Sequence, residues 1–300
     1  MHLGVLGNAG SWYVRDLERA AAGRGHRAAR LEFPQLVARC GIGAADHSPL
    51  TAHSPVAAAD LDLTRLDAVV VRTMPPGSLE QVVYRMDALA RLEAAGVAVL
   101  NPAKALECAV DKYLATCRLE AAGLPVPATL VCETADDALA AFEDLGGDVV
   151  VKPIFGSEGR GIVRVSDPEL ALRTFRTLER LQAVLYVQKY VRHEGCDVRV
   201  MVLDGRVIGA MRRCSADDFR TNVSRSARAE PHRPTDLEAD WALRAAQAVG
   251  ARFAGIDILY DASCAGYVIE VNAVPGWRAF SATTGIDVAA HVIASLESGG

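Results

Sequence analysis

Two apolar segments near the C-terminal end of the chain, residues 253–260 and 266–272, constrain its fold most. Both are rich in β-branched residues, and the short loop between them predicts a β-hairpin. The hairpin register places Asp257 directly opposite Glu270, and the period of two along a strand places Asn272 on the same face as Glu270. The neighbouring positions are apolar, so an unpaired carboxylate here would be costly. The hairpin therefore predicts a sheet that carries three clustered, oxygen-bearing side chains.

Those three side chains are typical ligands of a hard divalent cation. Proteins usually hold Mg²⁺ with one or two carboxylates together with substrate phosphates, so a site this sparse implies a nucleotide nearby. The alternative is that both acids simply face water, which is the more common situation for a single Asp or Glu. The apolar setting of the hairpin favours a Mg²⁺ site at Asp257, Glu270 and Asn272.

The sequence predicts that the whole chain is divided into three units. Residues 1–101 alternate predicted strands and helices, which is typical of an open α/β layer with a parallel sheet. Asn101-Pro102 interrupts the alternation because the residue before proline avoids the helical region. We therefore expect an N-terminal α/β domain over 1–101, a central subdomain over 102–186 and a strand-rich C-terminal subdomain over 187–300.

Two local expectations accompany this division. A single helix is expected over 103–121, because Gly123 follows it as a stop signal. Residues 43–60, with their alanines and prolines, are expected to form an irregular surface excursion.

Composition argues against several classes of protein. The chain of 300 residues has a formal net charge of −5, so no global basic field indicates a nucleic-acid partner. Its 7 cysteines are scattered without a CxxC pair, and the first residues lack a basic signal segment. No stretch approaches the roughly 18–20 apolar residues of a membrane span. We therefore expect a cytoplasmic protein with reduced thiols and no membrane partner.

Two glycine-rich segments are candidates for a phosphate site. The turn GNAG at 7–10 lies between a predicted strand and a helix, as in dinucleotide-binding folds, with Glu32 as a plausible ribose ligand. It lacks the full GxGxxG pattern, so a nicotinamide-dependent oxidoreductase is only an alternative. The segment 149–162 is stronger, because Lys152 ends an apolar strand and the glycine-rich loop after it can present N–H groups to phosphates. A plain hairpin is its alternative, although two residues would suffice for that turn.

From about Asn101 onward the chain resembles the ATP-grasp ligases, and within them the RimK-like α-L-glutamate ligases. The resemblance implies an ATP-grasp fold of mixed α/β and α+β class, in which an N-terminal open parallel domain precedes two α+β subdomains that clasp ATP. Seven segments occur in the family's order, and together they are highly specific: DKYLATCRLEAAGLPVP (111–127), VVVKPIFGSEGRGI (149–162), VQKYV (187–191), GCDVRVMVLDGRVIGAMRR (195–213), DFRTNVSR (218–225), AGIDIL (254–259) and EVNAVPGW (270–277).

The resemblance also implies a role for each matching position. The nucleotide would be bound through its phosphates, adenine and ribose by Lys112, Lys152, Gly156, Ser157, Gly159, Gly161, Gln188, Lys189, Tyr190 and Asp197. The γ-phosphate and the acyl phosphate would be contacted by Arg213, Arg220 and Asn222. The metal residues would be those of the hairpin, Asp257, Glu270 and Asn272, with two Mg²⁺ ions expected and Mn²⁺ as an alternative.

The chain departs from the family pattern at two places. Lys189 stands where relatives usually carry an acidic residue beside the adenine, so the acidic side-chain contact with adenine or ribose is absent there and backbone contacts are expected instead. Ser226 and Ala227 follow Arg225 where two glycines are expected, which makes a close backbone approach to substrate less certain. Neither change affects the predicted metal residues or the predicted phosphate-binding residues Lys112 and Lys152.

The substrate is expected to contact the N-terminal domain. Arg72 ends a predicted strand, at the edge where open α/β sheets bind ligands, although plain packing beside a helix capped by Ser78 is equally favoured. Arg199 and Arg225 are further candidates for contacts with substrate. The stretch at 70–89 resembles ligases that act on small glutamylated coenzymes of the methanopterin or methanofuran type.

Together these features predict an ATP-dependent, ADP-forming carboxylate–amine ligase. Phosphorylation turns a carboxylate into an acyl phosphate that an amine can attack, so no protein nucleophile is needed. We expect L-glutamate to be added to a small coenzyme-like acceptor, in an enzyme that can form a homo-oligomer. The alternatives are a ligase for another amino acid or for a protein C-terminus and, from other classes, a non-catalytic ATP-binding regulator or the oxidoreductase named above.

Overall fold

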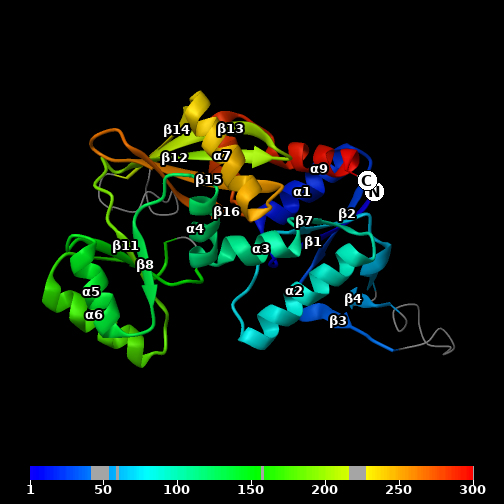
Figure 1. Cartoon of the computed structure of the whole chain (residues 1–300). Coiled ribbons are helices and arrows are strands. Elements are labelled where there is room, and N and C mark those ends of the chain that lie inside the picture. The colour runs from blue at the N-terminus through cyan, green and yellow to red at the C-terminus, as the bar shows by residue number, and fades with distance from the viewer. Residues whose placement is uncertain (42–53, 59–60, 157–158, 216–227, 300) are drawn as a thin grey trace.

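The computed structural model describes residues 1–41, 54–58, 61–156, 159–215 and 228–299. These residues form four β-sheets with helices packed around them, which confirms the predicted mixture of α/β and α+β layers. The two ends of the chain lie side by side at one edge of the molecule (Figure 1).

A parallel sheet forms the N-terminal domain, as predicted. Its strand order is β2-β1-β6-β7, and every pairing is parallel. Strands β1 and β6 are buried along almost their whole length, which is why they read as continuous apolar runs. The elements are β1 (His2–Leu6), α1 (Trp12–Gly23), β2 (Arg27–Leu31), β6 (Ala68–Val71), α2 (Leu79–Ala94) and β7 (Ala98–Leu100).

A small antiparallel sheet lies beside this domain. It consists of β3 (Leu36–Ala38), β4 (Val56–Ala58) and β5 (Leu61–Asp62), with the 3₁₀ turns η1 (Phe33–Gln35) and η3 (Leu63–Arg65) next to it. The expectation of an irregular surface excursion over 43–60 is wrong for β4, whose three residues are all buried. So short a strand gives no periodicity by which it could be recognised.

Two helices follow β7 where a single one was expected over 103–121. They are α3 (Ala103–Val110) and α4 (Lys112–Ala121), and the break falls at Asp111. The Asp111 carboxylate caps α4 by accepting a hydrogen bond from the Leu114 N–H at 3.0 Å. The Lys112 N–H donates to the Ile154 carbonyl oxygen at 3.3 Å, which ties the start of α4 to the glycine-rich loop.

An antiparallel sheet with its own core forms a separate lobe in the middle of the sequence. Its order is β10-β9-β11-β8, and two helices pack on it (Figure 1). The core of this lobe includes Phe142, Val151, Phe175 and Val187. Its elements are β8 (Thr129–Cys132), α5 (Ala135–Asp144), β9 (Val149–Lys152), β10 (Val163–Val165), α6 (Pro168–Arg180) and β11 (Leu185–Lys189).

The C-terminal part is a five-stranded antiparallel sheet of order β14-β13-β12-β15-β16. Its strands β15 and β16 are those of the predicted hairpin. The elements are β12 (Cys196–Leu203), β13 (Arg206–Cys214), β14 (Arg228–His232), α7 (Asp236–Val249), β15 (Phe253–Tyr260), β16 (Gly266–Asn272), α8 (Arg278–Thr284) and α9 (Val288–Ser298).

The N-terminal domain and the C-terminal sheet share their hydrophobic cores. One cluster joins Leu6 and Leu89 to Ile256, and a second joins Leu17 to Phe253 and Trp277. Helices α3 and α4 belong to the first of these clusters, since they pack against α7 and β16. The two outer parts of the chain are therefore packed together more intimately than either is with the lobe of α5 and α6.

The buried Asn101 joins the outer parts by hydrogen bonds. Its side-chain amide donates to the carbonyl oxygens of Phe253 at 2.5 Å and Ala273 at 2.6 Å. Its Oδ1 accepts from the N–H groups of Arg252 and Phe253, both at 2.8 Å. The residue expected to mark a domain boundary thus fixes both ends of the β15–β16 hairpin.

A disulfide joins Cys196 of β12 to Cys214 of β13, which lie directly opposite each other in the sheet. The expectation that all the cysteines are reduced thiols is therefore wrong for this pair. The two residues are 18 positions apart, and only strand pairing brings them together, so spacing along the sequence could not reveal the bond.

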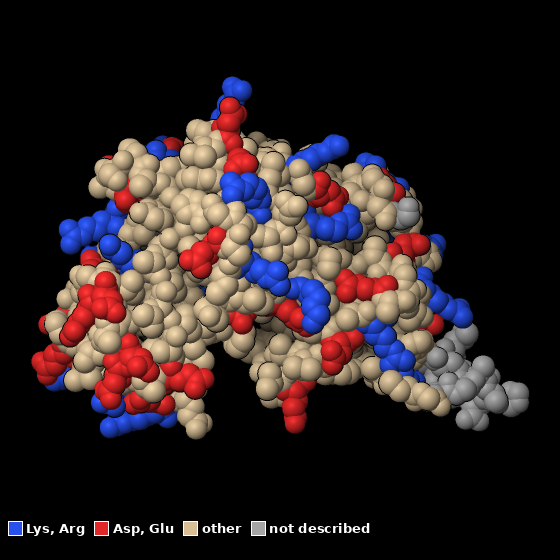
Figure 2. Space-filling model, viewed as in Figure 1, with Lys and Arg blue, Asp and Glu red and all other residues tan. Residues whose placement is uncertain are grey.

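Charge and hydropathy over the described residues show local patterns. Acidic side chains gather over the α5–α6 lobe in one view of the surface, whereas basic side chains are scattered there (Figure 2). No single helix in the described ranges has the length and apolarity of a membrane span; α8 and α9 pass that test only as a pair, bent by 106°.

Candidate active site

The β15–β16 hairpin has the predicted register at its functional end. Asp257 lies opposite Glu270, and Gly255 lies opposite Asn272. A β-bulge follows, since Ile258 pairs with Val268 and leaves Ile269 as the extra residue. The bulge was not predicted. The central expectation is confirmed, because the side chains of Asp257 and Glu270 line the same cavity.

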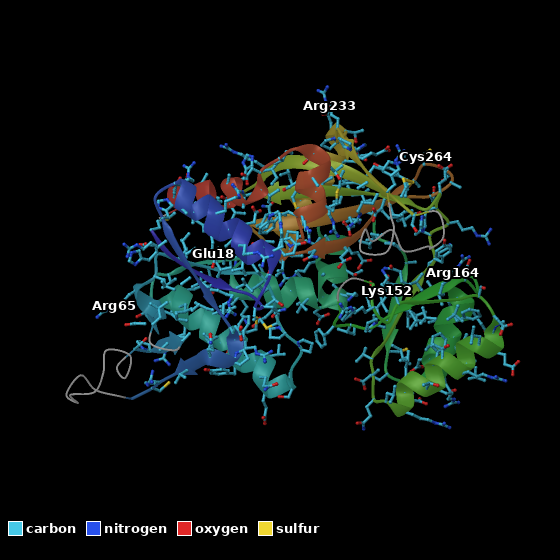
Figure 3. All side chains as sticks on the ribbon, turned by 180° about the vertical axis from the view of Figure 1, so that it is seen from behind. Glu18, Arg65, Lys152, Arg164, Arg233 and Cys264 are labelled. Carbon is cyan, nitrogen blue, oxygen red and sulfur yellow. A yellow bond between two sulfur atoms is a disulfide. The ribbon has the colours of Figure 1, made fainter. Side chains whose placement is uncertain are left out.

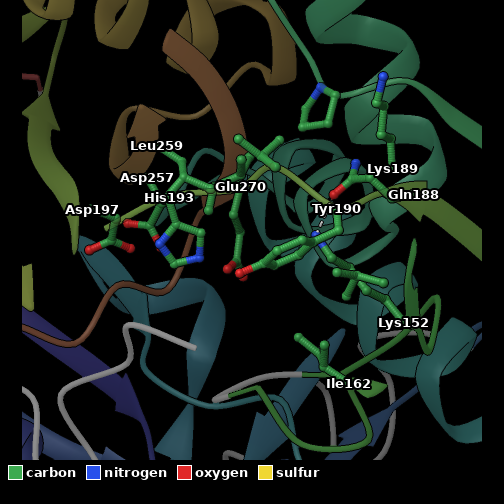
Figure 4. A pocket seen from close by; sticks show the side chains of 14 residues that line it. Lys152, Ile162, Gln188, Lys189, Tyr190, His193, Asp197, Asp257, Leu259 and Glu270 are labelled. Atoms are coloured by element: carbon green, nitrogen blue, oxygen red, sulfur yellow. Dashed lines mark hydrogen bonds between the residues drawn. The ribbon is translucent and has the colours of Figure 1, made fainter. Parts of the chain in front are cut away.

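This cavity lies between the α5–α6 lobe and the C-terminal sheet. Strands β9 and β11 form one wall, and the hairpin forms the other (Figure 4). It brings together seven of the predicted site residues: Lys152, Gln188, Lys189, Tyr190, Asp197, Asp257 and Glu270. The rest of the lining is mainly apolar and comprises Pro127, Val150, Ile162, Val191, His193, Leu259 and Ile269.

Lys152 supplies a buried positive charge in this cavity. Its Nζ donates to Gln188 Oε1 at 2.7 Å (Figure 4). The Gln188 amide in turn donates to the hydroxyls of Thr129 and Tyr186. Burial lowers the pKa of Lys152 to about 8, although the negative charge of Glu270 opposes this shift. The same residue lies where the lobe faces the C-terminal sheet (Figure 3). A bound phosphate would stabilise the charged form of such a buried lysine.

Lys112 holds the glycine-rich loop. Its Nζ donates to the carbonyl oxygens of Gly156 at 3.0 Å and Ile154 at 3.4 Å. Burial lowers its pKa, and the nearby Glu270 opposes that shift. Gly159 and Gly161 have φ values of 69° and 75°, a region that favours glycine. The loop and both predicted phosphate-binding lysines therefore lie around Glu270.

Four charged side chains form a buried network on β12, β13 and β15. Arg199 binds Asp257 through two hydrogen bonds of 2.7 Å. Arg213 donates to Asp197 through Nε at 2.7 Å and also through Nη2, and it lies 3.0 Å from Asp257. Arg213 is 2% exposed, so these contacts are shielded from water. The two arginines hold the pKa of Asp257 below its ordinary value despite burial.

The donor set at the hairpin fits Mg²⁺. Among the described residues, the Glu270 carboxylate has no hydrogen-bond or ion-pair partner, although it lies in the cavity near both lysines. Asn272 Oδ1 accepts one hydrogen bond, from the Val274 N–H at 2.8 Å. Both Asp257 oxygens also bind arginine, so Glu270 is the carboxylate of this set that is open to a cation. One such carboxylate with a nearby amide oxygen is the kind of sparse oxygen set that Mg²⁺ completes with phosphates.

Tyr190 contacts two residues that do not line the cavity, Arg164 and Asp148. The Arg164 guanidinium lies 3.6 Å from the centre of its ring, and Asp148 accepts two hydrogen bonds of 2.9 and 2.8 Å from Arg164. The Tyr190 N–H donates to the Asp148 carbonyl oxygen at 2.9 Å. This support was not predicted, and no pattern around Arg164 signals it.

The remaining predicted site residues lie elsewhere. Arg72 is not in the lining of the cavity; it is buried between the N-terminal domain and the loop after β16. Ser157, Arg220, Asn222 and Arg225 lie outside the described residues, so their predicted roles stay predictions. His193, which was not among the predicted site residues, lines the cavity.

We expect the affinity for ATP to fall as the pH rises through about 8, the pKa of Lys152. Its charged form binds phosphate, so ATP should raise this pKa and binding should take up a proton near pH 8.5. By the same linkage, the free energy of unfolding should rise with pH between about 8 and 10.5, the ordinary lysine value, because the unfolded chain holds this proton more tightly. Calorimetry in buffers of different ionisation enthalpy measures the uptake. Lys152→Met should abolish it, whereas Lys189→Met, at an exposed position on the same cavity, should retain it.

Two protein families match the chain. The RimK-like ATP-grasp domain matches residues 109–296, and the N-terminal domain of prokaryotic glutathione synthetase matches residues 15–107. The first match contains the residues that line the cavity, and the second contains strands β2, β6 and β7 of the parallel sheet.

Named relatives cover most of the chain. Tetrahydromethanopterin:alpha-L-glutamate ligase of Methanosarcina acetivorans is 32% identical over 319 residues, covering 96% of this chain and 95% of that protein. A probable alpha-L-glutamate ligase of Klebsiella pneumoniae is 32% identical, covering 99% and 96%. The ribosomal protein bS6–L-glutamate ligase of Salmonella newport is 35% identical over 217 residues, covering 71% and 72%.

Solved structures share the fold. The ATP-grasp ligase PsnB, bound to a minimal precursor, has a TM-score of 0.75 at 24% identity, covering 99% of this chain and 98% of that one. D-cycloserine synthetase DcsG has a TM-score of 0.71 at 19% identity, with coverage of 99% and 98%.

Proposed function

The chain belongs to the RimK-like ATP-grasp family, and from this premise we propose that it joins L-glutamate to a small coenzyme of the tetrahydromethanopterin type, with ADP as product. The family consists of carboxylate–amine ligases, so the chain is a ligase. The proposal concerns its acceptor and the amino acid that it adds.

The extent of one match carries the proposal. The similarity to the tetrahydromethanopterin ligase extends over 96% of the chain and so includes the N-terminal domain, whereas the match to the bS6 ligase covers 71%. Ligands of open α/β sheets bind at the carboxyl ends of the strands. A match over nearly the whole chain therefore supports a shared class of acceptor better than a match over 71% of it.

The cavity has the charges that an acyl-phosphate route requires. The ammonium groups of Lys112 and Lys152 would bind the ATP phosphates and stabilise the phosphoryl group as it transfers to the acceptor carboxylate. Glu270, Asp257 and Asn272 would hold Mg²⁺, which when bound neutralises charge on the phosphate oxygens. The Arg199 and Arg213 guanidinium groups lie behind Asp257 and keep it ionised. The amine of L-glutamate would then attack the acyl phosphate and release inorganic phosphate.

A product assay tests the proposal. The enzyme is incubated with ATP, Mg²⁺, L-glutamate and tetrahydromethanopterin, with a C-terminal peptide of bS6 in a parallel reaction. We expect ADP and a pterin product heavier by one glutamyl residue, formed only when both substrates are present. Glutamylation of the peptide alone would overturn the proposed acceptor. AMP and pyrophosphate as products would overturn the acyl-phosphate route, and tight ATP binding without turnover would favour a regulator.

A further inference from the structure

Arg72 is a buried guanidinium enclosed by aromatic rings. It directly follows β6, at the carboxyl edge of the parallel sheet, and it is 8% exposed. Its Cζ lies 4.2 Å from the ring centre of Trp277 and 5.0 Å from that of Tyr13. Cation–π contacts of this kind stabilise a positive charge away from water. The charge therefore persists at the junction between the N-terminal domain and the loop after β16.

The charge of Arg72 has no anionic partner among the described residues. Its one hydrogen bond there runs from Nη2 to the Pro275 carbonyl oxygen at 2.8 Å, and its buried Nε has no partner. Burial lowers the pKa of Arg72 to about 10. A buried cation is normally paired, because an unpaired one loses hydration without replacement. An anion next to Arg72 would supply the missing counter-charge.

A buried arginine elsewhere in the same domain shows the contrast. Arg85 is 6% exposed, lies 5.8 Å from the ring centre of Phe33 and donates to the Pro75 carbonyl oxygen at 2.6 Å. Its surroundings thus resemble those of Arg72, but none of its buried nitrogens lacks a partner. Of these two arginines, only Arg72 has a buried nitrogen without a partner among the described residues.

The groups next to Arg72 suit an anion from solvent. A Cβ on Gly7 would lie 3.6 Å from the Arg72 Cβ, so the 7–10 turn borders the arginine, and positions 8–10 of the turn are exposed. Helix α1 begins at Trp12, and its N-cap Ser11 makes no side-chain capping bond. Free N–H groups at a helix N-terminus attract negative charge.

The same place adjoins the ion-pair network of the cavity. Pro275, which accepts the hydrogen bond from Arg72, packs on Gly255 beside the Arg199 side chain. The point where a Cβ on Gly255 would lie is 3.1 Å from the Pro275 Cβ and 3.6 Å from the Arg199 Cδ. An anion held by Arg72 would therefore lie next to the loop after β16, which connects the surroundings of Arg72 to the cavity.

We propose that Arg72, the 7–10 turn and the start of α1 form a subsite for a carboxylate of the substrate. The carboxylate belongs either to L-glutamate or to the acceptor, and the subsite fixes that molecule to the N-terminal domain while its reactive end reaches the cavity. The inference rests on the proposed function, because it assigns the anion to a substrate of that reaction.

Arg72→Met tests the subsite, with Arg72→Lys as the charge-retaining variant and Arg85→Met as the matched buried control. A lost charge-assisted hydrogen bond predicts a rise of about 10- to 100-fold in the KM of the substrate that binds there. The KM of ATP should stay within about twofold, and Arg72→Lys should recover part of the loss. A rise for L-glutamate alone identifies its carboxylate, and a rise for the pterin alone identifies the acceptor.

Calorimetric titration of the Mg²⁺–AMPPNP complex with L-glutamate, and separately with tetrahydromethanopterin, gives a readout that needs no turnover. Weaker binding to Arg72→Met than to Arg85→Met supports the subsite even if no ligation is seen, in which case the proposed function fails by itself. Unchanged binding of both substrates, with only a lower melting temperature, would show that Arg72 merely joins the domains and would overturn the subsite.

Discussion

Replacing Glu270 with glutamine is expected to lower turnover about 1000-fold, since metal ions contribute several kcal/mol to transition-state charge stabilisation and each 1.36 kcal/mol is tenfold in rate. The carboxylate of Glu270 lies in the cavity without a protein partner in the described residues, near Lys112 and Lys152. Glutamine keeps the shape but removes the charge that a divalent cation requires. The rate is measured as release of ADP.

Metal binding distinguishes this role from a general loss of structure. Binding of Mn²⁺ to the enzyme–AMPPNP complex, followed by electron paramagnetic resonance, should weaken in Glu270→Gln. Glu143→Gln, at an exposed position on α5, should match the wild type in both measurements. Normal Mn²⁺ binding and normal turnover in Glu270→Gln would show that the hairpin is not the metal site.

Replacing Arg213 with methionine is expected to cost about 3–5 kcal/mol of unfolding free energy, because it removes a buried guanidinium from two buried carboxylates. Arg213 binds Asp197 and Asp257, and both carboxylates are 2% exposed. Its neighbour on β13 is the matched control: Arg212 is exposed, and its Nη1 lies 3.9 Å from Glu230 Oε1. Arg212→Met should stay within about 0.5 kcal/mol of the wild type. Urea unfolding measures both changes.

A double variant separates the lost ion pair from lost packing. Asp197→Leu combined with Arg213→Met also removes one of the two carboxylates that lose the Arg213 guanidinium, so it should be more stable than Arg213→Met alone. If the two proteins unfold at the same urea concentration, the penalty comes from packing around Arg213 and not from an uncompensated charge.

Local rules predicted the parts of this protein that repeat over short distances. The period of two placed Asp257 and Glu270 on one face of a hairpin, and the structure confirms both the register and the shared cavity. The alternation of strands and helices over 1–101 predicted the parallel sheet of the N-terminal domain, and the structure confirms it. A lysine ending a strand before a glycine-rich loop predicted the position of Lys152 in the cavity.

Features made by distant parts of the chain could not be predicted in this way. The partners of Asp257 come from two other strands, and which arginines reach it depends on the register of β12 and β13. The Cys196–Cys214 bond depends on that same register. Asn101 reads as a boundary from its proline neighbour, yet its amide binds backbone groups about 150 positions away. Residue types and spacing carry no record of such pairings.

The division of the hydrophobic cores has a consequence for hydrogen exchange. The N-terminal sheet and the C-terminal sheet share two cores and the Asn101 hydrogen bonds, so their central amides should open together, in a single cooperative event. The α5–α6 lobe has a core of its own and should open at lower free energy. ATP would contact both bodies across the cavity. Bound nucleotide should therefore slow hydrogen exchange most in β9 and β11. It should also raise the free energy of opening of the α5–α6 lobe toward that of the rest of the molecule.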